Sequence, residues 1–193
     1  TLRKTFKHYN IDGYIVPKND EFFGEYIPDH NDRLKYISNF SGSYGLALIL
    51  KNQNYLFVDG RYTIQAINQS GKYFKIITFP NNMPYNILKN KKLSIGFDPK
   101  LFTKKTLNIF FGKTNKNVRF KIIEKNLIDE IWKRKIKNKK IKFYTLPRNS
   151  VGNTHSFKIN KLVSFLKKRG ADFQFISSSE NNAWLLNIRG RDA

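Results

Sequence analysis

The sequence predicts an α/β protein: a mixed β-sheet flanked by helices, followed by the start of a second, similar domain. Three observations support this fold class. Short apolar runs bounded by Gly, Pro, Asn or Asp are typical of buried strands. Segments with apolar residues at helical spacing separate most of these runs. Two early runs are joined only by the polar segment 51–54, which indicates a hairpin before strands and helices begin to alternate.

The strand-like runs are rich in Ile, Val, Leu, Phe and Tyr. They begin or end at turn residues, as at Asp12-Gly13 and Pro17 around the first run. We expect strands at 14–16, 45–50, 55–58, 74–79, 93–97 and 118–123. The second and third of these flank the hairpin loop, so the third is expected to return alongside the second.

Helical spacing predicts the elements between these strands. The opening residues place three apolar side chains on one face of a short helix: Leu2, Phe6 and Tyr9. Further helices are expected at 19–26, from Pro28 through Ile37, at 61–69, at 103–110 and at 127–132. In the helix at 61–69 we expect Ile64 and Ile67 to face inward, and Gly71 to end the helix.

The composition changes after Arg134. Residues 134–142 are basic and lack a structural pattern, so they are the best candidate for a linker, with a nucleic-acid contact as the alternative. Beyond them we expect helices at 157–169 and 179–187 around a strand at 173–176. One strand cannot form a sheet by itself, so this second domain is expected to be incomplete. The predicted division is a domain at 1–134, a basic linker at 135–150 and an incomplete α/β domain at 151–193.

The net charge is +22, from 36 Lys and Arg against 14 Asp and Glu. Such a charge attracts phosphate polyanions, including nucleic acids. The competing interpretation is background composition, because Lys, Asn, Ile, Phe and Tyr are favoured throughout and lysines occur in every segment. We favour background composition and expect no specific nucleic-acid partner, since the chain has no RNA-recognition aromatic motif, zinc finger or focused basic helix.

The chain contains no cysteine, which excludes disulfides, thiolate metal sites and cysteine nucleophiles. It also lacks an apolar run of about 18 residues and a signal-peptide core. Hydrophobic residues make up 40% and aromatic residues 15% of the chain, enough for a substantial core. These features fit a globular cytoplasmic protein without a membrane partner.

Five segments of the chain match, in the same order, characteristic segments of one known family: Glu25–Pro28 with Asp32–Leu34 and Phe40–Gly45; Val58–Tyr62 with Gln65-Ala66; Gly96–Pro99; Asn126–Trp132; and Ala183–Gly190. Together they resemble the aminopeptidase P group of Xaa-Pro aminopeptidases, within the M24 metallopeptidases. The second resembles the VDGRYxxQA string of that group, and the last resembles its AWLLNxRG string. The resemblance extends over most of the chain, from about residue 11 to residue 192.

The resemblance implies a creatinase/prolidase N-terminal domain with a ribonuclease H-like motif, at the front of a cytosolic, three-domain enzyme. In that family a C-terminal "pita-bread" domain holds two divalent metals, usually manganese, through two Asp, one His and two Glu. No residue of this chain matches those ligands, so we expect no catalytic residue and no metal site in it, and the catalytic domain to be absent. The family further implies a proline-containing peptide as substrate and a homodimer.

Arg61 is the residue expected to bind substrate. In the resembling enzymes, the Arg of the DGRY string lies in the N-terminal domain and helps to bind the peptide. A guanidinium suits this role because its planar fork can grip a carboxylate or a peptide carbonyl. The alternative is an ion pair within the domain, with Asp59 or another acid. The residues alone leave both open, and the resemblance favours substrate.

Three positions depart from the family pattern. Tyr44 stands where the family has a small Ala, Asn39 where it has Gly, and Arg191 where it has Ser. A bulky Tyr44 in a tight turn is expected to alter packing near the substrate entrance. Trp184 and Arg189 follow the pattern, and we expect them to be structural.

The remaining site-like patterns predict no chemistry. The histidines His8, His30 and His155 lie far apart and form no HExxH motif. The segment Asp29–Asp32, with His30, is the only local group that resembles metal ligands, and we interpret it as a solvated helix start. Ser43 lacks the spacing of a phosphate loop and the context of a nucleophile, so we interpret it as a turn residue.

The sequence therefore predicts the N-terminal, non-catalytic portion of a metal-dependent Xaa-Pro aminopeptidase, which shapes substrate access and dimerisation. A stand-alone inactive remnant or binding module is the alternative. A nucleic-acid-binding protein is a third, less favoured hypothesis, supported only by the charge.

Overall fold

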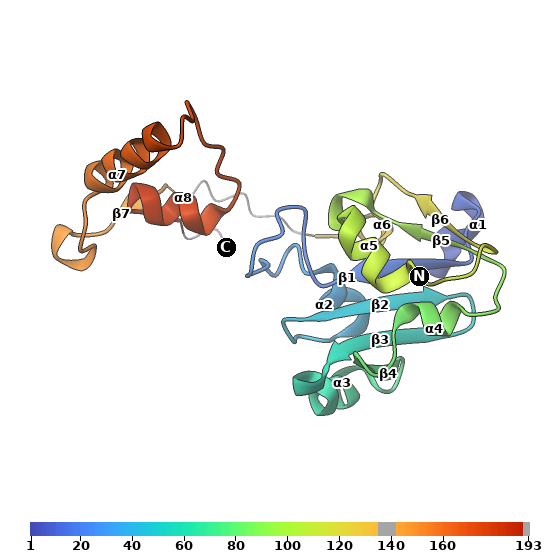
Figure 1. Ribbon diagram of the computed structural model, residues 1–193. Helices are drawn as coiled ribbons and strands as arrows, with labels where there is room; N and C mark the ends of the chain where they lie inside the picture. Colours follow the sequence, from blue (N-terminus) through green and yellow to red (C-terminus); the bar gives the residue numbers. More distant parts are fainter. Residues whose placement is uncertain (135–141, 191–193) are drawn as a thin grey trace. The chain divides into compact units, whose positions relative to one another are not determined.

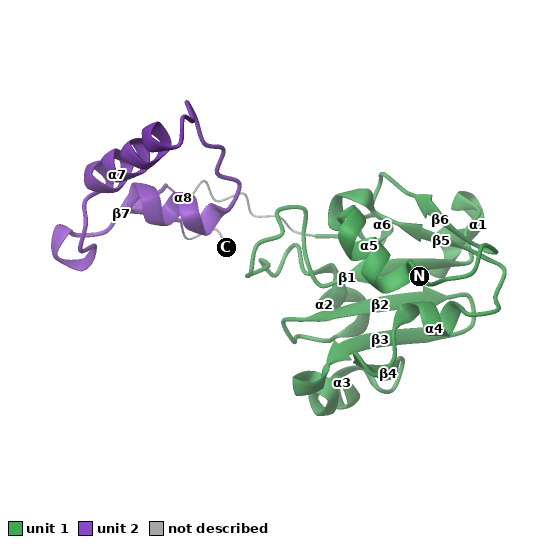
Figure 2. Ribbon diagram, in the orientation of Figure 1, with its two compact units in different colours: residues 1–136 green, residues 137–193 purple. Residues whose placement is uncertain are grey.

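The computed structural model describes residues 1–134 and 142–190. The chain divides into two compact units, residues 1–136 and residues 137–193 (Figure 2). Among the described residues, no helix combines the length and the apolar composition that crossing a bilayer requires.

The first unit is built on a six-stranded mixed sheet (Figure 1). Its strands are β1 (Gly13–Pro17), β2 (Gly45–Leu50), β3 (Asn54–Asp59), β4 (Lys75–Phe79), β5 (Leu93–Phe97) and β6 (Val118–Ile122). Their spatial order is β4-β3-β2-β1-β5-β6. β2 runs antiparallel to β1 and β3, and the other neighbouring pairs are parallel. The predicted mixed α/β fold with an early hairpin is confirmed.

Helices cover both faces of this sheet. One face packs against α1 (Arg3–Tyr9), α2 (Arg33–Ser38), α3 (Thr63–Ser70) and α6 (Leu127–Ile131). The other packs against α4 (Pro84–Leu88) and α5 (Lys104–Phe111). Successive residues of a strand point to opposite faces, so Tyr14 and Val16 enter the first core and Ile15 enters the second. β1 and β2 are buried along their whole length, which is why both read as continuous apolar runs.

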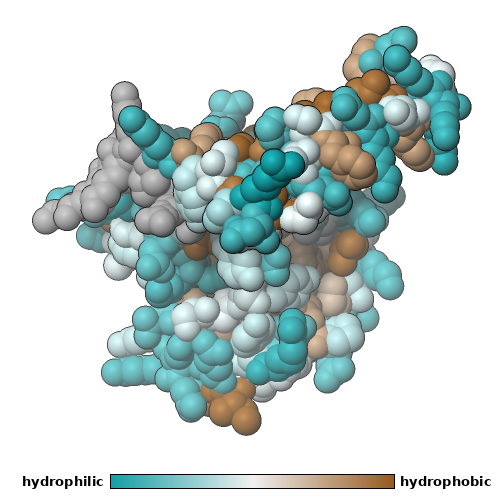
Figure 3. Space-filling view, turned by 90° about the vertical axis from the view of Figure 1, so that its left-hand side faces the viewer, coloured by the Kyte–Doolittle hydropathy of each residue, from teal (hydrophilic) through white to brown (hydrophobic). Residues whose placement is uncertain are grey.

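Polar groups are spread over the surface. On the face drawn in Figure 3, hydrophilic side chains cover most of the area, with apolar groups between them. They do not gather into one stripe on that face. This distribution agrees with lysines that occur in every segment of the sequence.

The predicted helix at 19–26 does not form. The side chain of Asn19 does not cap a helix; its amide donates to the carbonyl of Leu101, 3.0 Å away. Phe23 has φ +53°, in the left-handed region, which interrupts any right-handed helix. The next helix, α2, begins at Arg33 and not at Pro28, because the carboxylate of Asp32 accepts a hydrogen bond from the backbone N–H of Lys35 and caps it there.

The inward face of α3 also differs from the prediction. Ile64 and Ile67 are 77% and 54% exposed, whereas Ala66 is fully buried and Ser70 is buried beside it. A 3₁₀ turn, η1 (Gly60–Tyr62), precedes α3. Ala66 and Ser70 are four residues apart and so lie on the same side of α3, and this is the side that packs against the sheet. The small side chain of Ala66 lets α3 approach the strands closely.

The second unit contains α7 (His155–Lys168), α8 (Ser179–Leu186) and a short strand pair. β7 (Tyr144–Thr145) pairs antiparallel with β8 (Ile188–Arg189). Thr154 caps α7, since its hydroxyl accepts from the N–H of Phe157 at 3.2 Å. Arg169 caps the carboxyl end of α7, and Gly170, which follows it with φ +64°, ends the helix.

The residues between the two units and the segment after α7 differ from the prediction or lie partly outside the described residues. Part of the expected linker, residues 135–141, lies outside the described residues, and residues 144–150 hold β7 and a 3₁₀ turn, η3 (Arg148–Ser150). The expected strand at 173–176 is wrong, because that segment has no regular secondary structure and belongs to neither sheet. Phe173 and Phe175 are 87% and 86% exposed. A strand requires a neighbour to satisfy its backbone groups, and no described segment supplies one here.

The orientation of α3 predicts the effect of two matched substitutions. Ala66→Asp places a carboxylate in a fully buried position without a partner, and we expect a loss of about 3 kcal/mol or more in the free energy of unfolding. Ile64→Asp, on the exposed side of the first turn, is expected to change it by less than about 0.5 kcal/mol. Denaturant unfolding followed by circular dichroism measures both. A larger loss for Ile64→Asp would contradict the orientation.

Candidate functional site

Polar residues from the family-like segments of the first unit lie at one edge of the sheet. β1, β3, β4, β5 and β6 all run in the same direction, because β2 is antiparallel to both β1 and β3. Their carboxyl ends therefore meet at the same edge, where open α/β sheets usually bind ligands. Two polar clusters lie there: one follows β1, β5 and β6, and the other follows β3.

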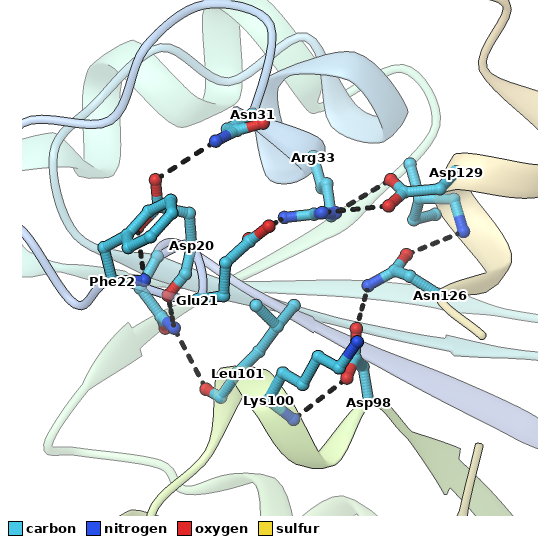
Figure 4. Close-up of polar contacts among 12 residues, drawn as sticks. Asp20, Glu21, Phe22, Asn31, Arg33, Asp98, Lys100, Leu101, Asn126 and Asp129 are labelled. Atoms are coloured by element: carbon cyan, nitrogen blue, oxygen red, sulfur yellow. Dashed lines mark hydrogen bonds and ion pairs between the residues drawn. The ribbon is translucent and has the colours of Figure 1, made fainter. Parts of the chain in front are cut away.

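Arg33 is the centre of the first cluster (Figure 4). Its Nε and Nη2 donate to the two carboxylate oxygens of Asp129 at 2.8 and 2.9 Å, and its Nη1 donates to Glu21 at 3.1 Å. The Arg33 side chain is only 5% exposed. Burial alone would lower its pKa, but the hydrogen bonds and charges of Asp129 and Glu21 outweigh that effect and raise it. The guanidinium is thus a buried, fully charged link between α2, α6 and the loop after β1.

Asp98 and Asn126 extend this cluster across the end of β5 (Figure 4). Asp98 is buried, and its carboxylate accepts from the side-chain amide of Asn126 at 2.8 Å and from the N–H of Lys100 at 2.9 Å. The carbonyl oxygen of the Asn126 side chain accepts from the N–H of Ile128 at 2.9 Å and caps α6. Three of the family-like strings, around Arg33, Asp98 and Asn126, therefore meet through hydrogen bonds within the protein.

The segment Asp29–Asp32 offers no metal site. Asp32 lies 2.5 Å from the ammonium of Lys18 and also caps α2, while Asp29 pairs with Lys35 at 2.9 Å. Nearby Asp20, which is buried, accepts from the N–H of Phe22 and from Asn31 and closes the loop (Figure 4). In residues 1–134 and 142–190, no group of three or more His, Cys, Asp or Glu is placed to hold a metal ion.

Arg61 is the centre of the second cluster. Its Nε and Nη2 lie 2.9 and 3.3 Å from the carboxylate oxygens of Asp59, whose Oδ1 also accepts from the N–H of Arg61. The hydrogen bonds between the two side chains lower the pKa of Asp59 and raise that of Arg61. The ion pair within the domain is therefore present. The Arg61 side chain nevertheless stays 72% exposed, and within the described residues its Nη1 has no acceptor.

A turn beside Arg61 joins residues 40–45, part of the first family-like string, to the string that contains Arg61. Ser43 hydrogen-bonds the hydroxyl of Tyr62 at 2.7 Å, and that bond lowers the pKa of the Tyr62 phenol. The hydroxyl of Ser41 accepts from both Gln65 and Gln69 at 2.9 Å and ties the turn to α3. Gly42 is required here, because a Cβ at this position would lie 2.3 Å from the ring of Phe40.

The departures from the family pattern have local explanations. Asn39 ends α2 with φ +65°, a left-handed conformation that Asn tolerates better than other residues with a side chain. Tyr44 is 46% exposed, and its ring packs edge-on against Phe79 with centroids 5.8 Å apart. Burial, and to a lesser degree the charge of Asp59, raises the pKa of Tyr44. Arg191 lies outside the described residues.

In the second unit, the family-like segment 183–190 forms an internal network. The buried ammonium of Lys158 donates to the carbonyl of Trp184 and to the side chain of Asn187, both at 2.6 Å, and lies 4.2 Å from the centre of the Trp184 ring. Arg189 donates to the carbonyl of Ala183 at 3.0 Å. These cations hold the carboxyl end of α8, where the helix dipole favours positive charge. Sequence analysis missed Lys158, because one Lys in a basic amphipathic helix carries no distinguishing signal.

Two family models match the chain, and both describe the creatinase/prolidase N-terminal domain. One covers residues 1–125, and the other covers residues 133–193. The chain belongs to the creatinase/prolidase N-terminal domain family. The clusters at Arg33 and Arg61 are therefore features of a creatinase-type domain, and the fold and family expected from the sequence are confirmed.

This creatinase-type chain is similar to curated proteins that are much longer than it is. It is 30% identical, over 99% of its length, to the probable Xaa-Pro aminopeptidase P of Laccaria bicolor and to Xaa-Pro aminopeptidase 1 of Dictyostelium discoideum. It spans only 31% and 33% of those two proteins.

Solved structures agree with this family. A crystal structure of X-prolyl aminopeptidase from Caenorhabditis elegans, described as a cytosolic enzyme with a di-nuclear active site, is 28% identical over 99% of this chain and 34% of that chain, with a TM-score of 0.79. A creatinase/prolidase-like N-terminal domain from Corynebacterium diphtheriae, 19% identical with a TM-score of 0.51 over 63% of this chain and 90% of that chain, shows the same fold.

The buried guanidinium predicts a large effect on stability. Arg33→Met leaves Glu21 without its cation and Asp129 with fewer donors, and we expect a loss of about 2–4 kcal/mol in the free energy of unfolding. Lys35→Met is the matched control, because it removes a cation from the exposed pair with Asp29 and is expected to cost less than about 1 kcal/mol. Denaturant unfolding measures both. Equal losses would show that the Arg33 pair is no more important than a surface ion pair.

Proposed function

We propose that this chain is the N-terminal, non-catalytic part of a metal-dependent Xaa-Pro aminopeptidase, which releases an N-terminal residue that precedes proline. The observation that carries the proposal is similarity over 99% of the chain to a di-nuclear X-prolyl aminopeptidase, of which the chain spans 34%. The family models name the same N-terminal domain. The substrate is then a peptide with proline in its second position.

Hydrolysis is assigned to a catalytic domain outside these 193 residues. A di-nuclear centre needs several carboxylate and imidazole ligands that converge on one point. The described residues do not fit such a centre, since the acids of the segment Asp29–Asp32 bind lysines or a helix N-terminus. We assign two divalent metals, manganese in our proposal, to that other domain. No step of the reaction is assigned to residues of this chain.

The contribution of this chain is to shape the entrance for the peptide and to supply Arg61. Asp59 uses the Nε edge of the guanidinium, which fixes the direction of the side chain, while Nη1 remains without an acceptor within the described residues. A peptide carbonyl or carboxylate can bind at that open side. Tyr44 packs beside Phe79 and follows the Ser43 turn. Because Tyr is larger than the Ala of the family pattern, it narrows the entrance through which the peptide reaches Arg61.

We propose a cytoplasmic protein that forms a homodimer and has no specific nucleic-acid partner. Support for the location is the cytosolic description of the Caenorhabditis elegans enzyme. The alternative function is a stand-alone binding module without peptidase activity, and the two experiments below distinguish it from the leading proposal.

The first experiment uses the chain of 193 residues by itself. With manganese added, we expect no release of the N-terminal residue from an Xaa-Pro peptide, because the metal ligands belong to another domain. Liquid chromatography of the reaction products measures release. Metal-dependent turnover by this chain, abolished by a chelator, would overturn the assignment of catalysis to another domain.

The second experiment uses a polypeptide that joins this chain to a catalytic domain of the family. Arg61→Ala is expected to lower kcat/KM about tenfold to a hundredfold, because a charged hydrogen bond to the peptide is lost, with metal content unchanged. Arg61→Lys keeps the charge but not the fork and is expected to recover only part of the activity. Arg119→Ala removes an exposed Arg from β6 as the matched control. Unchanged kinetics in Arg61→Ala would exclude the substrate role.

A further inference from the structure

A polar hollow lies at the opposite edge of the first unit from the clusters around Arg33 and Arg61. It is bounded by α1, by the turn before β1 and by the hairpin between β2 and β3, and has a volume of about 530 Å³. Its lining consists of Arg3, Phe6, Lys7, Asn10, Ile11, Asp12 and Lys51. A volume of this size is within the range of small-molecule sites. The family-like strings do not include this hollow, so the proposed function leaves it unexplained.

The charges of the lining do not cancel. Among the described residues that line the hollow, Asp12 alone carries a carboxylate. Both of its oxygens are occupied: Oδ1 lies 2.5 Å from the ammonium of Lys51, and Oδ2 accepts from the N–H of Ser94 at 2.8 Å. The hydrogen bond from Lys51, followed by that from Ser94, lowers the pKa of Asp12 and keeps it ionised. Asp12 and Lys51 thus neutralise each other. Arg3 and Lys7 remain as two positive charges without a counter-charge in the hollow.

Arg3 is held in place by neutral acceptors. Its Nε donates to the carbonyl of Leu50 at 2.9 Å, and its Nη2 donates to the side-chain oxygen of Asn54 at 2.7 Å. These bonds fix one edge of the guanidinium and leave its charge uncompensated. In the described part of the chain, Nη1 has no acceptor, so the edge between Nη1 and Nη2 is open. A guanidinium with one fixed edge and one open edge loses little freedom when an oxyanion binds.

Two more polar groups border the open edge. The side chains of Lys7 and Asn10 make no hydrogen bond to the rest of the described protein. Asn10 is held at the end of α1 with φ +49°. Phe6 and Ile11, both buried, form the apolar floor. The hollow therefore combines a fixed guanidinium, a free ammonium and a free amide above an apolar base.

We propose that this hollow binds a phosphate dianion carried by a small molecule, that is, a phosphomonoester. The open fork of Arg3 matches two phosphate oxygens, and Lys7 and Asn10 supply a charge and an amide donor for the remaining ones. Two positive charges match the dianion, whereas a monocarboxylate would leave one unmatched. The volume exceeds the need of phosphate alone, which leaves room for the esterified group beside Phe6 and Ile11.

Inorganic phosphate is the probe, and the full chain of 193 residues is the protein. Backbone amide NMR shifts are recorded during titration at constant ionic strength with potassium chloride. We expect saturable shifts confined to residues 3–12, 50–54 and 94, with sulfate bound similarly and acetate bound more weakly. Shifts that do not saturate, or that follow lysines over the whole surface, would overturn the proposal, because they would report the net charge of +22 and not a site.

Substitutions separate the site from the general charge. Lys7→Gln is expected to raise the dissociation constant for phosphate about tenfold, the size of one charged hydrogen bond, and Arg3→Lys to raise it at least as much because the fork is lost. Lys7 makes no bond in the described protein, so Lys7→Gln tests the proposal even where Arg3→Lys weakens folding. The control removes two charges from the start of α5 by Lys104→Gln with Lys105→Gln, and is expected to change affinity less than twofold. A control that loses as much affinity as Lys7→Gln would overturn the site.

Discussion

The buried charge of Arg33 constrains the whole first unit. A guanidinium that is 5% exposed must be neutralised inside the protein, and its partners come from segments far apart in sequence. Glu21 belongs to the loop after β1, and Asp129 belongs to α6, 96 residues after Arg33. The requirement to pair this charge therefore fixes α2, α6 and the loop against the same edge of the sheet. Asp98 and Asn126 extend the same constraint to β5.

This constraint explains why family-like strings that are far apart in the sequence lie next to one another in the fold. Three of the five strings are joined by hydrogen bonds at Arg33 and Asn126, and the turn at Ser41 joins the first of them to a fourth string, which contains Arg61. Most of their polar groups are used to hold elements together. Arg61 differs from them, because it is mostly exposed and only one edge of its guanidinium is used. That difference is the physical basis for assigning a binding role to Arg61 and a structural role to Arg33.

The two edges of the sheet carry different chemistry. At the carboxyl edge, acids and bases pair with each other, and the guanidinium of Arg61 beside Tyr62 is mostly exposed. At the amino edge, Lys51 neutralises Asp12, and Arg3 and Lys7 line the hollow without a carboxylate partner among its described residues. The second unit presents a third type of surface, an apolar groove of about 590 Å³ lined by aromatic residues such as Phe157 and Trp184. The chain thus has three different surfaces on separate elements: a polar one at the carboxyl edge, a positively charged one at the amino edge and an apolar one in the second unit.

The sequence by itself determined the elements whose signal is local. The continuous apolar runs of β1 and β2, the hairpin between β2 and β3 and the capped helix α7 each follow from side chains close in sequence. The family-like strings identified the family, because the strings and their order along the chain can be read from the sequence alone. Arg61 was singled out with both of its possible partners, and the ion pair with Asp59 was one of them.

Only the tertiary structure decided features that depend on distant neighbours. Ile64 and Ile67 face solvent because the opposite side of α3, which carries Ala66 and Ser70, packs against the sheet, and local spacing does not decide between the two sides. Residues 173–176 have the composition of a strand but no described partner, and a strand is defined by its neighbour. The burial of Arg33 and Lys158, and the uncompensated charge beside Arg3, arise from segments brought together by folding. Electrostatic balance is a property of three-dimensional distances, so no local pattern in the sequence reports it.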